Sequence, residues 1–157
     1  MERLKEGIRL RENGDLTQAN LLLKELVQEY PDNAQVNYQC AWSYDALGLE
    51  KEAIPYYERA IRLGLPGRDQ QEAYIGLGSS LRAIGAYQKA KEILEESIMK
   101  FDDRAAKVFL AITLHNLGEH GEAVRTLLEL LLTTSSDERI QSYQKALLFY
   151  ADKLARL

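Results

Sequence analysis

Several residue types are scarce in this sequence of 157 residues. A single cysteine excludes an intramolecular disulfide and leaves too few thiols for a structural zinc site. Only three prolines accompany a hydrophobic content of 46%, and this composition excludes a disordered chain. Lysine and arginine number 20 against 24 aspartates and glutamates, so the net charge is −4 and no basic surplus can neutralise phosphates. We therefore expect no nucleic-acid partner.

Long apolar runs are missing as well. No stretch approaches the length of about 18 apolar residues that a membrane-spanning helix needs. The N-terminal sequence MERLKEGIRLREN alternates charges where a signal peptide has an apolar core. These absences predict a cytoplasmic protein without a membrane partner. The length suits one domain, which we place over residues 1–157.

Four glycines recur between helix-like segments: Gly14, Gly48, Gly85 and Gly118 are 34, 37 and 33 residues apart. Each has a small residue seven positions before it and a large apolar residue four before it. Alanine follows five positions after each, and another large apolar residue nine after. In glycine order these columns are Gly7, Ala41, Gly78 and Ala111; Leu10, Tyr44, Leu81 and Leu114; Ala19, Ala53, Ala90 and Ala123; and Leu23, Tyr57, Leu94 and Leu127. The columns indicate four copies of one unit.

Each unit has the apolar periodicity of two amphipathic helices joined at the glycine. Small residues let two antiparallel helices approach closely, and glycine ends the first helix because it adopts a left-handed conformation at little cost. We expect the units at about residues 1–33, 34–70, 71–103 and 104–135. One helix at 137–156, capped by Ser136 or Asp137, should then cover the last exposed face, giving nine helices.

This order of small residue, glycine and alanine resembles the tetratricopeptide repeat (TPR), a helix-turn-helix unit of about 34 residues. The resemblance covers about residues 2–135. It implies an all-α fold, a right-handed α-solenoid of four TPR helix pairs with a C-terminal capping helix. Only the first unit keeps the family's terminal proline, at Pro31. We expect a longer loop at residues 64–70, and a late start or a bend at Pro55, because proline costs about 3 kcal/mol inside a helix.

The second half resembles a particular bacterial TPR subfamily to which no activity is assigned. The similar strings are SSLRAIG (79–85), FLAITLHNLG (109–118) and YQKALLFYAD (143–152). This resemblance supports the same fold and leaves the function open.

The TPR resemblance implies that the first helix of every pair lines a concave wall. Side chains three, six and ten positions before each loop glycine point to that wall. The column three positions before the glycine is mostly polar and holds Arg11, Asp45, Arg82 and His115. We predict a partner-binding surface that draws on these columns and on the terminal helix. Its residues are Tyr38, Trp42, Asp45, Ser79, Arg82, Val108, Ile112, His115, Tyr143, Leu147 and Tyr150.

A wall of aromatic residues with an arginine is typical of peptide and helix recognition. In this interpretation Arg82 binds a carboxylate or a backbone carbonyl, and Trp42 with Tyr38 supplies flat apolar contact. The alternative for Arg82 is an ordinary ion pair with Asp45. We expect the aromatic residues of the terminal helix to serve packing more than recognition. The sequence thus predicts a scaffold that binds a peptide or helix of a partner protein in its groove.

Residues for other activities are missing. The TPR co-chaperones that hold a C-terminal carboxylate use lysine, asparagine and arginine side chains. The matching positions here are Leu4, Ile8, Gln39, Glu72 and Gly76. His115 and His120 lie on either side of a helix-ending glycine without an evident third metal ligand, and Ser79 has no base beside it in its own helix. We expect no catalysis, no cofactor and no metal.

Two other functions stay open from the sequence. The first is self-association through an open N-terminal edge formed by Leu4, Ile8, Leu22 and Leu26, which would make a homo-oligomer. The second is a sensor that binds a small ligand or peptide with Arg82 and His115.

Overall fold

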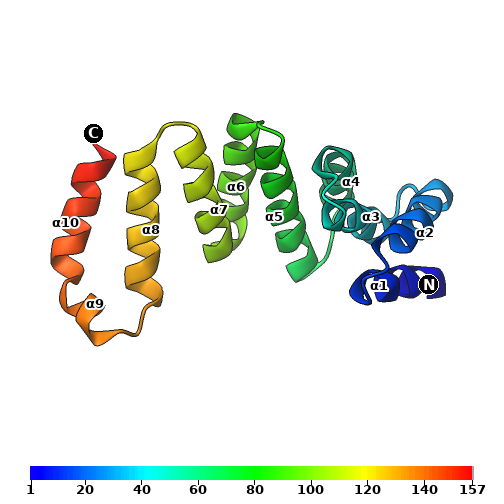
Figure 1. The fold of residues 1–157 in the computed structure, drawn as a ribbon, viewed down its shortest axis with the longest axis horizontal. Helices are drawn as coiled ribbons and strands as arrows, with labels where there is room; N and C mark the ends of the chain where they lie inside the picture. The colour runs from blue at the N-terminus through cyan, green and yellow to red at the C-terminus, as the bar shows by residue number, and fades with distance from the viewer. Residues whose placement is uncertain (157) are drawn as a thin grey trace. The chain divides into compact units, whose positions relative to one another are not determined.

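The computed structural model describes residues 1–156, which are helical apart from the connecting turns (Figure 1). The ten helices of this described part are α1 (Glu2–Glu12), α2 (Leu16–Glu29), α3 (Ala34–Ala46), α4 (Glu50–Leu63), α5 (Gly67–Ala83), α6 (Tyr87–Phe101), α7 (Arg104–Asn116), α8 (His120–Thr134), α9 (Glu138–Ser142) and α10 (Gln144–Ala155). The predicted all-α class is confirmed. None of these helices has both the length and the apolar sequence that a membrane crossing requires.

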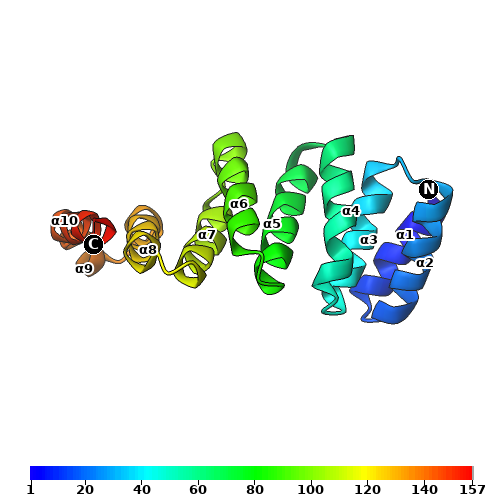
Figure 2. The same ribbon diagram turned by 90° about the horizontal axis from the view of Figure 1, so that it is seen from above.

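The chain divides into two compact units, each described by itself below. Unit 1 is Met1–Ala86 and contains α1 to α5, and unit 2 is Tyr87–Leu157 and contains α6 to α10. Within unit 1, helices that follow one another along the chain pack side by side from α1 to α5 (Figure 2). Within unit 2, α6 packs on α7, α7 on α8, and α10 on α8.

The four loop glycines end the first helix of each pair as predicted. Gly14, Gly48, Gly85 and Gly118 have φ angles of 88°, 74°, 86° and 81°. A residue with a side chain rarely adopts this left-handed conformation, so glycine is favoured at each turn.

The core of unit 1 forms where α1, α2 and α3 meet. Leu23, Leu26, Val36 and Cys40 are fully buried in one cluster. A Cβ atom at Gly7 would lie 2.9 Å from the Leu23 side chain, so the small residue of the first column is required for close packing. Burial raises the pKa of the Cys40 thiol to about 12, which keeps this buried cysteine in its neutral, unreactive form.

Helix α4 runs through Pro55 and begins five residues before it, at Glu50. The expected late start is therefore wrong. Proline at this position removes the donor that would reach the carbonyl of Lys51, four residues earlier. Lys51 and Pro55 are both exposed, so water can satisfy that carbonyl in place of the missing helix hydrogen bond.

The loop expected at residues 64–70 is shorter in the structure. Helix α5 already begins at Gly67, and the extra residues lengthen it to 17 residues. Pro66 is extended in front of the helix, where its fixed φ is tolerated. The backbone N–H of Leu65 donates to Oε1 of Gln70 over 3.0 Å, which fixes the turn against the first turn of α5.

The terminal segment, expected as one helix, forms two helices that meet at Tyr143. Asp137 caps the first one as predicted, because its carboxylate accepts hydrogen bonds from the N–H groups of Arg139 and Ile140. The Gln141 amide donates to the carbonyls of Leu132 and Ser135, both at 2.8 Å. These bonds hold the short α9 against the end of α8.

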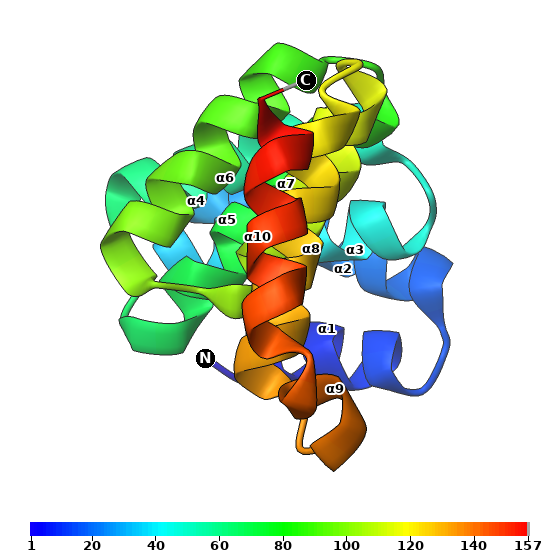
Figure 3. The same cartoon turned by 90° about the vertical axis from the view of Figure 1, so that its left-hand side faces the viewer.

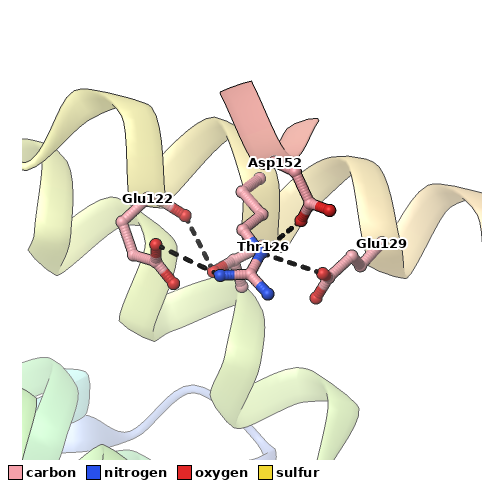
Figure 4. A network of polar contacts seen from close by, with 5 residues as sticks. Glu122, Thr126, Glu129 and Asp152 are labelled. Carbon is pink, nitrogen blue, oxygen red and sulfur yellow. Dashed lines mark hydrogen bonds and ion pairs between the residues drawn. The ribbon is translucent and has the colours of Figure 1, made fainter. Parts of the chain in front are cut away.

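Helix α10 lies antiparallel along α8 (Figures 1 and 3). Any side chain at Gly121 of α8 would meet the backbone carbonyl of Leu154, so the two helices touch where one of them has no side chain. Arg125 of α8 lies 3.1 Å from Glu129, 3.7 Å from Glu122 and 3.7 Å from Asp152 of α10 (Figure 4). The Gly121 contact and the Arg125 charge network are thus two of the contacts between α8 and α10.

Candidate partner-binding site

The eleven predicted site residues fall into both units. Tyr38, Trp42 and Asp45 lie on α3, Ser79 and Arg82 on α5, Val108, Ile112 and His115 on α7, Tyr143 between α9 and α10, and Leu147 and Tyr150 on α10. The first five therefore belong to unit 1 and the other six to unit 2. That both sets share one continuous groove stays a prediction.

An aromatic cluster occupies the site residues of α3. The ring centroids of Tyr38 and Trp42 are 5.8 Å apart, and those of Tyr38 and Tyr57 are 6.4 Å apart. Tyr38 is buried, at 4% exposure, whereas Trp42 keeps 40% of its surface exposed. The tyrosine thus supports the tryptophan from within, and the tryptophan is the ring that a partner can reach.

Asp45 has a structural partner in the neighbouring helix. The hydroxyl of Tyr57 donates a hydrogen bond of 2.9 Å to Oδ2 of Asp45. Burial raises the pKa of Asp45, and the hydrogen bond from Tyr57 acts in the opposite direction. Tyr57 in turn fills the space that a side chain at Gly76 of α5 would occupy. Asp45 therefore serves first to fix Tyr57, the member of the aromatic cluster that packs against Tyr38.

Arg11 of α1 completes this face, although it was not among the predicted site residues. Its guanidinium carbon lies 3.5 Å from the ring centroid of Trp42, a cation–π contact. Its Nη2 donates to Oε1 of Gln39 over 3.2 Å. Burial lowers the pKa of Arg11, because its charged form loses part of its hydration. Arg11 stands three residues before Gly14, in the same column as Asp45, and that column is the sequence signal that would have found it.

Acidic groups border the other side of the aromatic cluster. The pKa of Tyr38 is raised to about 12, mainly by burial and further by the charges of Asp69 and Glu72 on α5. Oδ2 of Asp69 accepts a hydrogen bond of 2.8 Å from the Gln35 amide on α3. We call the surface formed by Arg11, Tyr38 and Trp42 the Arg-Trp face. It has a cation at its α1 side and carboxylates at its α5 side.

The two remaining predicted residues of unit 1 lie on α5. Ser79 and Arg82 are both half-buried. Arg82 is in the last turn of the helix, so its charge lies at the end where a cation interacts favourably with the helix dipole.

The site residues of α7 in unit 2 are exposed. Val108 keeps 41% and Ile112 40% of its surface accessible. His115 contacts His120 across the α7–α8 turn, with 2.9 Å between the two Nδ1 atoms. The turn therefore brings together two rings whose positions in sequence suggested no shared face. Within residues 1–156 no three histidine, cysteine or acidic side chains are grouped to hold a metal ion.

The aromatic residues of the terminal segment do not pack as expected. Tyr143 is 55% and Tyr150 57% exposed, and Phe149 beside them is 58% exposed. Leu147 is half-buried, and Ala151 is the one buried residue of α10. The expectation of packing is therefore wrong for the tyrosines, because α10 presents to α8 a stripe that does not include them.

Unit 2 also contains a hollow of about 940 Å³ between α6, α7, α8 and the end of α10. Its lining mixes charged residues such as Lys91 and Glu119 with apolar ones such as Leu114 and Leu154. The Nζ of Lys91 lies 3.4 Å from Oε2 of Glu119, so these two charges neutralise each other.

The apolar residues proposed for an open N-terminal edge are partly used inside unit 1. Leu26 is fully buried and Leu4 packs against the cluster that contains it. Ile8 and Leu22 are half-buried. Two of the four residues named for self-association thus already have intramolecular partners.

Similarity to known proteins is found in both sequence and structure. Residues 34–154 match a family described as Tetratrico peptide repeat, and residues 4–33 match another described as Tetratricopeptide repeat. A comparison with curated proteins gave no match.

Among solved structures, one crystal structure of MamA is 24% identical, with a TM-score of 0.74 over 96% of this chain and 90% of MamA. A second MamA structure is 23% identical, with a TM-score of 0.76 over 98% of this chain and 86% of that one. The TPR protein YrrB is 16% identical, with a TM-score of 0.67 over 99% of this chain and 86% of YrrB. These identities are low, so the likeness concerns the fold. Together with the glycine turns and the paired helices, the family match over most of the sequence shows that this chain belongs to the tetratricopeptide repeat family.

Proposed function

We propose that the chain is a non-catalytic scaffold that binds a peptide or helix of a partner protein, and that the Arg-Trp face of unit 1 is its main contact. The exposed tryptophan carries this proposal. Trp42 is 40% exposed in a unit where Tyr38 and Tyr57 are buried. Tryptophan and arginine are the residues most enriched among those that dominate binding energy at protein interfaces.

The way Trp42 is held supports a binding role. Tyr38 packs against it and the guanidinium of Arg11 stacks on it, so the ring is kept in one orientation before any partner arrives. A rigid aromatic side chain loses little conformational entropy on binding, which favours affinity. YrrB, which has the same fold, is described as a TPR protein with an unusual peptide-binding site.

The α7 residues extend the proposal to unit 2. Val108 and Ile112 are exposed apolar side chains on the first helix of their pair. We expect them to add apolar contact for the same partner. Ser79, Arg82 and His115 would add polar contacts at the ends of α5 and α7.

The test compares two variants of unit 1 with similar exposure at the changed residue. Trp42→Ala removes the proposed contact, and Leu21→Ala removes a side chain of α2 that is 47% exposed. Proteins captured by each immobilised variant are quantified by mass spectrometry, after circular dichroism has shown that both variants fold. We expect Trp42→Ala to weaken capture of the specific partner at least about tenfold, as for a residue that dominates an interface, and Leu21→Ala to leave it unchanged. A folded Trp42→Ala protein that retains every partner would contradict the proposal.

Direct contact can be followed by fluorescence, because Trp42 is the single tryptophan of the chain. Adding the captured partner to the unmodified protein should change the emission of this one residue. Unchanged emission at saturating partner would place the contact elsewhere.

A further inference from the structure

Arg11 differs from Arg3 and Arg125 in having no carboxylate at ion-pair distance. Arg3 lies 2.7 Å from Glu29 and 3.5 Å from Glu25, and Arg125 has three carboxylates around it. Within residues 1–156, no carboxylate lies at ion-pair distance from Arg11. The amide oxygen of Gln39 is the acceptor that its guanidinium reaches.

One polar atom of Arg11 is enclosed without a hydrogen bond. Its Nε is buried and has no acceptor within the described residues. A partly buried guanidinium that meets a neutral amide and a ring has lost hydration without gaining a direct ion pair. An incoming carboxylate can supply that charge and bond to two N–H groups of the guanidinium at once.

The nearby acidic residues do not fill this role: Glu12, next to Arg11 in the chain, acts on its charge through space but forms no ion pair with it. Asp45 accepts from Tyr57, and Asp69 accepts from Gln35. Asp69 and Glu72 belong to α5, on the other side of the aromatic cluster. They disfavour a partner that carries many acidic groups, and they restrict the favourable position for a negative charge to the α1 side.

We infer that the partner of the Arg-Trp face is a peptide segment that places one carboxylate on the guanidinium of Arg11 and an adjacent apolar side chain on Trp42. This inference rests on the proposed function. The carboxylate belongs to an aspartate or glutamate side chain or to the end of a chain, and both sources offer the same two oxygens. The position differs from the lysine and asparagine positions of the co-chaperone clamp, where this chain has Leu4 and Ile8.

The experiment uses two phage-displayed libraries of random dodecapeptides against the immobilised full chain. Peptides of one library are attached through their C-terminus, and peptides of the other have a free C-terminus. Selected peptides are kept when Trp42→Ala abolishes their binding, and are then synthesised with each carboxylate intact or neutralised. Neutralisation replaces aspartate by asparagine, glutamate by glutamine, or a free C-terminus by its amide. Affinities are measured by the fluorescence of Trp42.

Arg11→Gln is the test variant and Arg9→Gln is its matched control. Arg9 is on the same helix, exposed, and paired with Glu6 at 2.8 Å. Arg11→Lys keeps the positive charge but lacks the planar guanidinium group that can donate two parallel hydrogen bonds, so it tests the charge separately from the geometry. Binding of the neutral peptides to each variant shows whether the face itself is intact.

The expected result is that one carboxylate in each peptide raises affinity at least about tenfold in the unmodified chain, as for a charged hydrogen bond. Arg11→Gln should erase this difference, Arg11→Lys should reduce it, and Arg9→Gln should preserve it. Trp42-dependent peptides that bind equally well without any carboxylate would overturn this inference while leaving the proposed function in place. Failure to select any Trp42-dependent peptide would count against both.

Discussion

The two units place residues of the same repeat column in different surroundings. Leu23 in unit 1 and Leu127 in unit 2 both stand nine positions after a loop glycine. Leu23 is fully buried in the α1–α3 core, whereas Leu127 is 43% exposed on α8. Residues at the same column position are therefore equivalent in sequence without being equivalent in packing.

The difference follows from what covers each helix. Helix α2 packs on α1 on one side and on α3 on the other, so its apolar residues are enclosed. Helix α8 packs on α7 and on α10, and α10 approaches it at Gly121 and Arg125. The end of unit 2 thus retains exposed apolar and aromatic side chains such as Phe149 and Tyr150, while unit 1 exposes the rings of Tyr30 and Trp42.

The largest effect is expected from shortening the buried leucine. Leu23→Ala should lower the free energy of unfolding of unit 1 by about 2–5 kcal/mol, because it leaves a cavity in a closely packed core. Leu127→Ala, the same change at the matching position of unit 2, should cost less than about 1 kcal/mol because the side chain is already partly in water. Urea unfolding, followed by hydrogen exchange in each unit, measures both. Equal costs for the two variants would contradict the comparison.

The next effect concerns the attachment of α10. Gly121→Ala should weaken its docking by about 1–3 kcal/mol, because the new methyl group meets a backbone carbonyl that a side-chain rotation cannot move. Amide hydrogen exchange should accelerate in α10 and stay unchanged in unit 1. Val124→Ala, at an exposed position of the same helix, is the control. If α10 keeps its protection in Gly121→Ala, the close contact at this glycine is not what holds it.

A smaller effect is expected at alkaline pH in unit 1. A tyrosine in the unfolded chain ionises near pH 10, about two units below the pKa of about 12 that burial gives Tyr38. The stabilisation from neutral Tyr38 is therefore complete below about pH 10 and is lost as the pH rises toward 12. Thermal unfolding between pH 9 and about 12 should show a shallower decline in Tyr38→Phe than in the unmodified chain. Parallel curves would show that Tyr38 does not contribute.

The smallest effect is expected from the exposed charge network on α8. Arg125→Gln removes its ion pairs to Glu122, Glu129 and Asp152, so α10 should exchange its amide protons slightly faster. High salt should produce the same acceleration in the unmodified chain and little further change in the variant, because salt screens exposed ion pairs. If amide exchange of α10 in the variant still responds fully to salt, charges other than that of Arg125 account for the salt effect.

Much of the helical framework was predictable from local sequence. The turn glycines, the Asp137 cap and the burial of Cys40 follow from backbone preferences and apolar periodicity, which act over a few residues. The repeat column also contained the signal for Arg11. The column alone did not show that Arg11, among its members, contacts the aromatic cluster. That depends on the position of the Trp42 ring, which lies on another helix.

Other features depended on contacts that no local pattern encodes. Pro55 is accommodated because its turn of α4 faces water. The break at Tyr143 goes with hydrogen bonds from Gln141 to the end of α8. The exposure of Tyr150 depends on which side of α10 packs against α8. The sequence of α10 does not specify that side, because its aromatic and apolar residues lie around the helix.

The sequence by itself determined the repeat, its helical pairs and the residues that end each first helix, because glycine conformation and helix periodicity are local properties. The tertiary structure alone decided which arginine stacks on Trp42, which carboxylates already have partners and which aromatic rings remain in water. Those outcomes depend on distances between helices, and such distances are fixed when side chains from separate parts of the chain pack together.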